Sequence, residues 1–273
     1  MTEYYVKISI LISLYNNEKE ENLFSCLDSL KNQTILASEV ILVLDGYVRD
    51  SLLEIVNNFK SVLNIKIIKI SENVGLGKAL NYGLKFCNYN YVARMDTDDI
   101  CLPDRLEKQM SFIYQNPDID ILGTSIIEFD EFNNQRKKEL PLSKNKIRDF
   151  SKEKNPFNHM TVIFKKSAVT SVGGYMHHHY MEDYNLWLRM IHKNMNTANL
   201  RDITVMARVG RSMLLKRRGL KYLFSEFTLF KLKNHLEITS FFSGFFIFFK
   251  RSLSRIIPVF LLRIVYNMNR ERL

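Results

Sequence analysis

Short apolar segments alternate with helix-like segments through the first half of the chain, and this alternation restricts the fold more than any other feature. Four apolar runs are predicted to be buried strands, at residues 8–14, 40–44, 65–70 and 91–95. Apolar residues recur at helical spacing in the segments that separate or follow them, at 20–32, about 52–59, 76–87 and after Pro103. Strands connected in this way predict an α/β, Rossmann-like, mostly parallel sheet with helices on both faces.

The second half of the chain is less regular, and its elements are predicted one at a time. Residues 119–129 and 160–164 have the composition of strands, and residues 182–193 have the apolar spacing of a helix. The polar, lysine-rich segment 133–154 is predicted to be an excursion over the surface.

Composition excludes several classes of protein. With 46% hydrophobic and 25% charged residues, the chain has the composition of a folded domain and not of a disordered one. Its three cysteines form no CxxC pair, so the sequence indicates neither a disulfide framework nor a zinc site. The first apolar run lacks the basic flank and cleavage site of a secretory signal. A cytoplasmic location is therefore predicted.

Aspartates follow two of the predicted strands, where open parallel sheets bind their ligands. The segment Asp96-Thr97-Asp98-Asp99 follows the fourth strand directly. Asp96 and Asp98, one residue apart in a tight turn, can both reach one Mg²⁺ or Mn²⁺ ion, since these ions prefer oxygen ligands. Such an ion neutralises charge on a departing diphosphate. The alternative is that these aspartates cap the next helix or form a turn.

Three further residues are candidates for binding a nucleotide. Asp45 ends the second strand and can accept a hydrogen bond from a uracil N3–H or a ribose hydroxyl, although an Asp-Gly turn explains it equally simply. Tyr15 ends the first strand beside the same crevice and can pack on a base. Lys78, at the start of a helix, can meet a phosphate, although helix entry alone explains the neighbouring glycines.

Glu182-Asp183 is the candidate for acid–base chemistry. The pair lies between Gly173-Gly174-Tyr175, predicted to be a mobile loop, and the helix that contains Trp187. A carboxylate with a raised pKa can take a proton from an attacking hydroxyl group. The alternative is that the two acids complement the dipole of the helix that they begin.

The last third of the chain carries the whole basic excess. Residues 1–188 hold 22 Lys+Arg against 25 Asp+Glu, whereas residues 189–273 hold 17 against 4. Such asymmetry favours a polyanion partner, either nucleic acid or an anionic membrane surface. A basic helix is predicted at 216–235, and apolar stretches follow at 241–249 and 256–264. Neither stretch is long enough to span a bilayer, so helices lying in the membrane interface are predicted.

Taken together, these motifs resemble the family 2 inverting glycosyltransferases of the GT-A fold. The resemblance covers residues 8 to about 189 and follows the family's order in six segments: ISILISLYNN, EVILVLDG, ENVGLGKALNYGL, ARMDTDDICLPDRLEKQ, SVGGY and MEDYNLWLRM. The sequence departs from the family at Leu44, where many members have the first aspartate of a pair. No QxxRW pattern follows Asp183, which argues against a processive polymerase.

By resemblance, each candidate receives a role. Nucleotide-sugar binding falls on Ser13, Tyr15, Asp45, Asn73, Lys78 and Asp96. The metal motif falls on Asp96 and Asp98, with Asp98 the more direct ligand of Mn²⁺ or Mg²⁺. The catalytic base falls on Asp183.

The LVLDG and ARMDTDD segments look most like bacterial transferases for O-antigen and exopolysaccharide repeat units. This implies transfer of galactose or glucose from a UDP-sugar to an undecaprenyl-diphosphate-linked sugar, at the inner face of the plasma membrane. Residues 1–210 would form the catalytic domain, with a nucleotide-sugar half at about 1–110 and an acceptor half at about 111–210. Residues 211–273 would form an amphipathic helical extension that binds anionic membrane and no nucleic acid.

Two rival functions stay open at this point, as does the exact reaction. One rival is a nucleotidyltransferase, although its GG-x-G-T-R loop is missing after the first strand. The other is a non-enzymatic basic protein that binds membranes or nucleic acid. Donor sugar, acceptor sugar, linkage, choice of metal and oligomeric state are open too, as is whether residues 216–264 bind membrane or pack on the catalytic domain.

Overall fold

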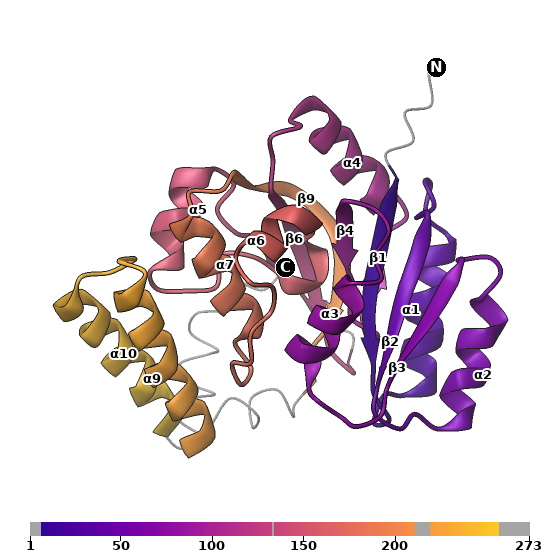
Figure 1. Cartoon of the computed structure of the whole chain (residues 1–273), viewed down its shortest axis with the longest axis horizontal. Coiled ribbons are helices and arrows are strands. Elements are labelled where there is room, and N and C mark those ends of the chain that lie inside the picture. Colours follow the sequence, from indigo (N-terminus) through magenta and orange to yellow (C-terminus); the bar gives the residue numbers. More distant parts are fainter. Residues whose placement is uncertain (1–6, 133, 211–218, 257–273) are drawn as a thin grey trace.

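The computed structural model describes residues 7–132, 134–210 and 219–256. One nine-stranded sheet runs through the molecule, with helices on both of its faces and a helical hairpin at one end (Figure 1). Its strand order is β3-β2-β1-β4-β8-β6-β9-β5, and β7 pairs with β6. This is the predicted α/β architecture with a C-terminal helical extension.

The first half of the chain folds as predicted. Its elements are β1 (Ile8–Leu14), α1 (Glu20–Lys31), β2 (Glu39–Asp45), α2 (Asp50–Phe59), β3 (Ile65–Ile70), α3 (Leu76–Leu84) and β4 (Tyr91–Arg94). Neighbouring strands among β3, β2, β1 and β4 are all parallel. Their carboxyl ends therefore meet at one edge of the sheet, where the predicted ligand-binding residues lie.

The second half turns the sheet into a mixed one. Its elements are β5 (Ile100–Cys101), α4 (Arg105–Gln115), β6 (Ile121–Phe129), β7 (Gln135–Lys138), α5 (Lys144–Ser151), the 3₁₀ turn η1 (His159–Thr161), β8 (Ile163–Lys165), α6 (Lys166–Ser171), α7 (Glu182–His192) and β9 (Thr197–Arg208). β8 runs antiparallel to both β4 and β6, whereas β6 and β9 are parallel. The mostly parallel arrangement that was predicted holds for β3, β2, β1 and β4 and for β6–β9, whereas β8, β5 and β7 pair antiparallel with their neighbours.

Two expectations for this half were wrong. Segment 133–154 is not a plain surface excursion, because it contains β7 and α5, and α5 buries Ile147 completely. Of the predicted strand 160–164, the first part is the turn η1. The long strand β9 was not predicted. Its middle residues are exposed and its register with β6 shifts near Thr124 and Ser125, so it lacks the regular pattern of a buried strand.

Two apolar layers cover the two faces of the sheet. On one face, α1, α2 and α4 pack on the side chains that include Ile10 and Leu42. On the other face, α3, α6 and α7 pack on the side chains that include Leu11 and Ile41. Successive residues of one strand point to opposite faces, which explains why β1 and β2 are apolar throughout.

The C-terminal hairpin consists of α9 (Leu220–His235) and α10 (Phe241–Ile256). It lies at the end of the molecule occupied by α5 and α7 (Figure 1). Of the predicted tail, residues 216–218 and 257–264 lie outside the described residues. Across the described chain, none of the helices combines the length and apolarity needed to cross a membrane.

Candidate active site

A cleft of about 320 Å³ opens at the carboxyl ends of β1, β2 and β4. Its lining residues are Ser13, Tyr15, Glu18, Asp45, Asn73, Gly75, Leu76, Asp96, Thr97 and Asp98. Six residues predicted to bind nucleotide sugar or metal therefore share one cavity. Lys78 is exposed on α3 and is not part of this lining.

Tyr15 and Asp45 occupy different positions in the cleft. The Tyr15 side chain is 40% exposed, which leaves its ring accessible to a base. Asp45 is buried, and its two carboxylate oxygens accept the backbone N–H groups of Val74 at 2.7 Å and Gly75 at 3.0 Å. Asp45 thus fixes the loop that enters α3, while each of its oxygens can still accept a second hydrogen bond.

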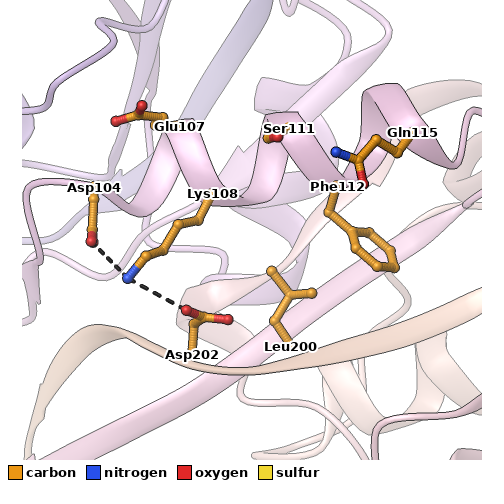
Figure 2. A pocket seen from close by; sticks show the side chains of 8 residues that line it. All are labelled: Asp104, Glu107, Lys108, Ser111, Phe112, Gln115, Leu200 and Asp202. Atoms are coloured by element: carbon orange, nitrogen blue, oxygen red, sulfur yellow. Dashed lines mark ion pairs between the residues drawn. The ribbon is translucent and has the colours of Figure 1, made fainter.

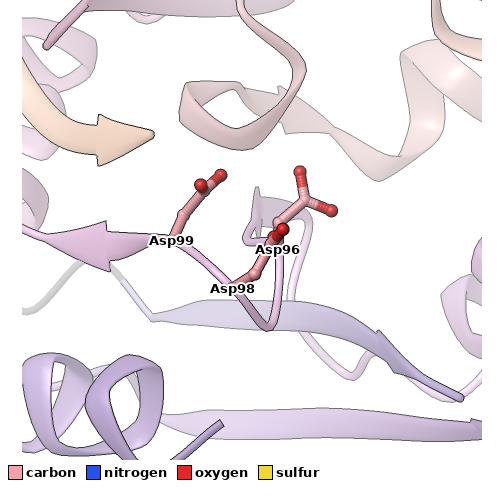
Figure 3. A group of neighbouring side chains, drawn as sticks. All are labelled: Asp96, Asp98 and Asp99. Carbon is pink, nitrogen blue, oxygen red and sulfur yellow. The ribbon is translucent and has the colours of Figure 1, made fainter. Parts of the chain in front are cut away.

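Three carboxylates gather in the loop after β4, and Figure 3 shows them converging. One oxygen from each of Asp96, Asp98 and Asp99 lies within 4.8 Å of the others. Burial, and then the charges of Asp96 and Glu18, raise the pKa of Asp98 to about 7. Burial is also the main cause of the raised pKa of Asp99. Burial and mutual repulsion therefore disfavour the ionised forms of these carboxyl groups. A bound cation would offset the repulsion between the carboxylates.

Distant segments hold the carboxylate loop in place. The backbone N–H of Arg208, at the end of β9, donates to Asp99 Oδ1 at 2.8 Å, and Arg208 Nε donates to the Asp98 carbonyl at 3.2 Å. Thr97 Oγ1 donates to the buried carboxylate of Glu18. On the other side, Arg94 forms an ion pair with Asp96. The loop is thus anchored from β9, from the segment after β1 and from β4.

This arrangement fits a divalent metal ion. The donors are carboxylate oxygens, the ligands that Mg²⁺ and Mn²⁺ prefer. Asp99 Oδ2 is buried and has no hydrogen-bond partner among the described residues. A buried carboxylate oxygen without a partner costs free energy, and a cation would satisfy it. Asp96 and Asp98 were predicted as ligands from the sequence, and the structure adds Asp99 to the group.

Asp183 lies at the start of α7 with both carboxylate oxygens engaged. Oδ2 accepts a hydrogen bond from Asn155 Nδ2 at 2.6 Å, and Oδ1 accepts the backbone N–H of Tyr184 at 2.7 Å. Burial raises the pKa of Asp183, although these two hydrogen bonds and the charge of Arg94 oppose the rise. Arg94 therefore interacts electrostatically with Asp183 and is also paired with Asp96, which links the two acidic groups.

Glu182 is the second carboxylate at this position. Burial, and then the charge of Asp183, raise its pKa to about 7. Its side chain packs against α3 at Gly77, where an added Cβ would come within 2.9 Å of the Glu182 Cβ. Both acids of the pair therefore have the raised pKa that suits a general base, and only an experiment that separates them can assign the role.

The profile of the family described as "Glycosyl transferase family 2" matches residues 9–175. The chain belongs to this family. Residues 9–175 include the whole cleft lining and the carboxylate cluster, whereas Asp183 and Arg208 lie beyond the matched segment.

Relatives of this family 2 glycosyltransferase act in bacterial polysaccharide synthesis. The chain is 49% identical over 263 residues to the amylovoran biosynthesis glycosyltransferase of Erwinia amylovora, covering 96% of this chain and 99% of the relative. It is 37% identical over 223 residues to the UDP-Gal:α-D-GlcNAc-diphosphoundecaprenol β-1,3-galactosyltransferase of Escherichia coli, covering 81% and 80% of the two chains.

Solved structures share the fold at low identity. TarS 1–349 from S. aureus, in complex with UDP-GlcNAc, superposes with a TM-score of 0.66 and 19% identity, covering 91% of this chain and 72% of that one. A mannosyltransferase from Pyrobaculum calidifontis, in complex with GDP-Man and Mn²⁺, superposes with a TM-score of 0.64 and 12% identity, covering 96% and 79%. One neighbour contains a UDP-sugar and the other is a mannosyltransferase, and this shared architecture confirms the GT-A fold predicted from the motifs.

Several residues of this glycosyltransferase site escaped the sequence reasoning. They are Glu18, Arg94, Asp99, Asn155 and Arg208. Only Asp99 gave a signal, because it continues the Asp96-Thr97-Asp98 run. Arg94 lies in the ARMDTDD segment itself, but its pairing with Asp96 was not predicted. Glu18, Asn155 and Arg208 reach the site from segments without a motif, up to 110 residues away from their partners.

The glycine loop before α7 is held in place and does not have the loose contacts expected of a mobile loop. Arg189 donates to the backbone carbonyls of Val172 and, at 2.6 Å, Gly174. Tyr175 is buried, and its hydroxyl forms a 2.9 Å hydrogen bond with His159 Nε2. The left-handed backbone of Gly173 and Gly174, with φ of 86° and 68°, is what makes this tight path possible.

A second pocket, of about 540 Å³, lies between α4 and β9 (Figure 2). Its single lysine, Lys108, pairs through Nζ with Asp104 at 2.6 Å and with Asp202 at 3.4 Å, and Glu107 is a third acidic side chain of the lining. It contains none of the residues that form the cleft described above.

Proposed function

We propose that the protein is an inverting, non-processive, metal-dependent glycosyltransferase that moves a hexose from a UDP-sugar to a lipid-diphosphate-linked sugar in bacterial surface polysaccharide synthesis. The observation that carries this proposal is the pairing of two acidic groups through Arg94. The Asp96–Asp98–Asp99 cluster lines the cleft, and the separate Asp183 has a raised pKa. A diphosphate leaving group and a deprotonated acceptor need such groups on opposite sides of the transferred sugar.

The donor is proposed to be UDP-galactose or UDP-glucose. Tyr15 supplies an accessible ring for the base, and Asp45 supplies acceptor oxygens for a uracil or ribose group. The Escherichia coli relative is named as a UDP-Gal-dependent galactosyltransferase, and the S. aureus structure contains UDP-GlcNAc. Asn73 also lines the cleft. Lys78 does not, so it would contact a phosphate of the donor only if the donor extends beyond the cleft lining.

In the proposed mechanism, Asp183 takes the proton of the acceptor hydroxyl group. The acceptor oxygen forms its bond to the anomeric carbon, and the bond from that carbon to the diphosphate oxygen breaks, leaving both electrons on the diphosphate. Attack from the opposite side inverts the anomeric centre. Asp96 and Asp98, with Asp99, would hold a Mg²⁺ or Mn²⁺ ion, which when bound neutralises charge on the diphosphate. The ion pair with Arg94 holds the Asp96 side chain in position, and the positive charge of Arg94 opposes the rise in the pKa of Asp183.

A donor panel tests this function. The purified chain is incubated with Mn²⁺, a lipid-diphosphate-linked GlcNAc and, separately, UDP-galactose, UDP-glucose, UDP-GlcNAc and GDP-mannose, and nucleotide release is scored. Acceptor-dependent release of UDP from a UDP-hexose is expected, with the product in the inverted anomeric configuration by NMR. Release from GDP-mannose alone, or release that ignores the acceptor, would contradict the proposal.

The C-terminal hairpin is proposed to bind the anionic face of the membrane. Its outer surface carries Phe241, Phe242, Phe245, Phe246 and Phe249, each between 52% and 84% exposed. Phe224 on α9 is 67% exposed as well. The lysines Lys221, Lys231 and Lys250 are also exposed on this hairpin. An apolar stripe flanked by lysines matches the interface of an anionic bilayer, and it would keep the cleft at the cytoplasmic face, where lipid-linked acceptors lie.

Co-sedimentation with anionic vesicles tests the membrane proposal. Replacing Phe242 and Phe246 by serine is expected to lower the partition coefficient at least ~10-fold, since each buried phenylalanine contributes roughly 1.5–3 kcal/mol. Salt should weaken binding of the unchanged chain without abolishing it, because lysines add about 1 kcal/mol each and the apolar contribution is unscreened.

The matched control for this experiment is a Phe24→Ser variant. Phe24 is 53% exposed on α1, away from the hairpin, and its loss should leave vesicle binding unchanged. If the chain stays in the supernatant with anionic vesicles, the membrane proposal is wrong.

A further inference from the structure

The C-terminal hairpin reaches the loop that follows α5. That helix ends at Ser151, and the last carbonyl groups of a helix have no partners within it. Lys233 Nζ of α9 donates to the Lys152 carbonyl at 2.8 Å. Arg251 Nη1 of α10 donates to the Glu153 carbonyl at 2.6 Å. Lys233 and Arg251 therefore both donate at the C-terminal end of α5. Burial lowers the pKa of Lys233 to about 7, so Arg251 supplies most of the positive charge that the helix dipole favours there.

Both side chains are largely buried and do not lie on the exposed surface of the hairpin. Arg251 pairs with Glu226 through two hydrogen bonds, of 2.6 and 3.0 Å, and Glu226 is only 2% exposed. Lys233 is 2% exposed and lies 4.8 Å from the centre of the Tyr184 ring. The buried face of α9 thus includes two ionisable side chains, Glu226 and Lys233, while Leu220 and Phe224 are exposed to solvent. Buried charges are retained only where they have partners, and here the partners are the other member of the Glu226–Arg251 pair and the carbonyls of one loop.

The same loop leads to Asp183. Two residues after the Arg251 contact, Asn155 Nδ2 donates to Asp183 Oδ2. The other end of the loop is tied to the residue next to Asp183, because the Tyr184 hydroxyl donates to the Ser151 carbonyl at 2.6 Å. A short loop therefore connects the hairpin cations to the side chain that orients the proposed base.

We propose that Lys233 and the Glu226–Arg251 pair position the Asp183 carboxylate through the 151–155 loop and Asn155. They are positioning residues, since none of them contacts the cleft, and this inference rests on the proposed role of Asp183. The hairpin then has two functional faces. Its exposed phenylalanines face the proposed membrane surface, and its buried charged side chains hold Asp183 in the orientation that sugar transfer requires.

The test uses full-length variants. Arg251→Met alone leaves Glu226 buried without its counter-charge and can unfold the hairpin, so the main variant is Glu226→Gln with Arg251→Met. Lys233→Met is the second variant. Lys31→Met and Lys60→Met are matched controls, because each removes an exposed lysine charge from the end of a helix that belongs neither to the hairpin nor to the cleft lining. The main variants are expected to lose about 10-fold in kcat at unchanged donor KM, whereas the controls keep the kcat of the parent chain.

The pH profile provides a readout that a merely structural role would not move. The Asn155 hydrogen bond lowers the pKa of Asp183, so its loss should shift the acid limb of kcat to higher pH. The other titratable or charged groups that interact with Asp183 are Arg94, Tyr175, His178, Glu182 and Tyr184. Of these, His178 and Tyr184 also interact with Glu226, and Tyr184 with Arg251, so the pH profile is compared for Lys233→Met, which keeps both of those charges.

A double-mutant cycle with Asn155→Ala identifies the route. If Lys233 acts through Asn155, then Lys233→Met should cost little further kcat in the Asn155→Ala background. Fully additive losses, or losses equal to those of the Lys31 and Lys60 controls, would overturn the positioning role. The Asp183→Asn variant separates the two proposals. If this variant retains full kcat, the assignment of Asp183 as the base is wrong. If this variant loses kcat but the hairpin variants match the controls, only the positioning inference is wrong.

Discussion

Asp98→Asn is expected to lower the rate of sugar transfer by about 10³-fold or more. A metal at the carboxylate cluster contributes several kcal/mol to stabilising the charge of the departing diphosphate, and each 1.36 kcal/mol is tenfold in rate. Burial and the charges of Asp96 and Glu18 disfavour the ionised form of Asp98. Removing this charge should therefore leave the thermal unfolding temperature of the metal-free protein unchanged or raised, which separates lost chemistry from lost fold.

Metal removal should reproduce this effect in the unchanged chain. EDTA is expected to abolish transfer, and added Mn²⁺ or Mg²⁺ to restore it. Titration calorimetry of the metal-free protein with Mn²⁺ gives a readout that does not depend on activity, and Asp98→Asn should abolish that binding. Asp118→Asn, which changes an exposed aspartate outside the cluster, is the matched control. Full turnover in EDTA would show that the cluster serves another purpose.

Asp183→Asn is expected to lower kcat by roughly 10²–10⁴, the usual contribution of a general base. The substitution keeps the shape of the side chain but removes its capacity to take the acceptor proton. Donor KM should barely change, because Asp183 is not part of the cleft lining. In the unchanged chain, kcat should rise with pH through the raised pKa of Asp183, since the base works only when ionised.

Glu182→Gln decides whether the correct carboxylate has been assigned. Both acids of the pair have raised pKa values, so chemistry alone does not distinguish them. The proposal expects Glu182→Gln to retain most of kcat and the acid limb of the pH profile. A large loss in this variant, with Asp183→Asn nearly unaffected, would transfer the role to Glu182.

The family result settles one alternative that the sequence left open. Because the chain belongs to glycosyltransferase family 2, a nucleotidyltransferase on a similar sheet has no observation in its favour. The described part of the basic tail, residues 219–256, forms a helical hairpin. That the tail binds no nucleic acid stays a prediction. The division at residue 210 between domain and extension stays a prediction.

Local pattern was sufficient for the first half of the fold. A parallel strand buried on both faces is a nearly continuous apolar run, so Ile8–Leu14 could be predicted to the residue. The edge strand Ile65–Ile70 was predicted to the residue as well, although it contains two lysines and is only partly buried. The positions of Asp45 and Asp96 at strand ends followed from the same pattern. Parallel strands bring their carboxyl ends to one edge, and for this reason the cleft could be placed before any coordinates were known.

Tertiary structure alone decided which distant groups complete the site. Arg208 donates a hydrogen bond to the Asp98 carbonyl from 110 residues away in sequence. Thr97 donates to Glu18 over a separation of 79 residues, and Asn155 donates to Asp183 over a separation of 28 residues. Nor did the apolar pattern of the tail predict that α9 buries Glu226 and Lys233. Hydrophobic periodicity predicts which side of each segment is buried. A hydrogen bond or an ion pair depends instead on which distant residue the fold brings into contact, and the local sequence does not identify that residue.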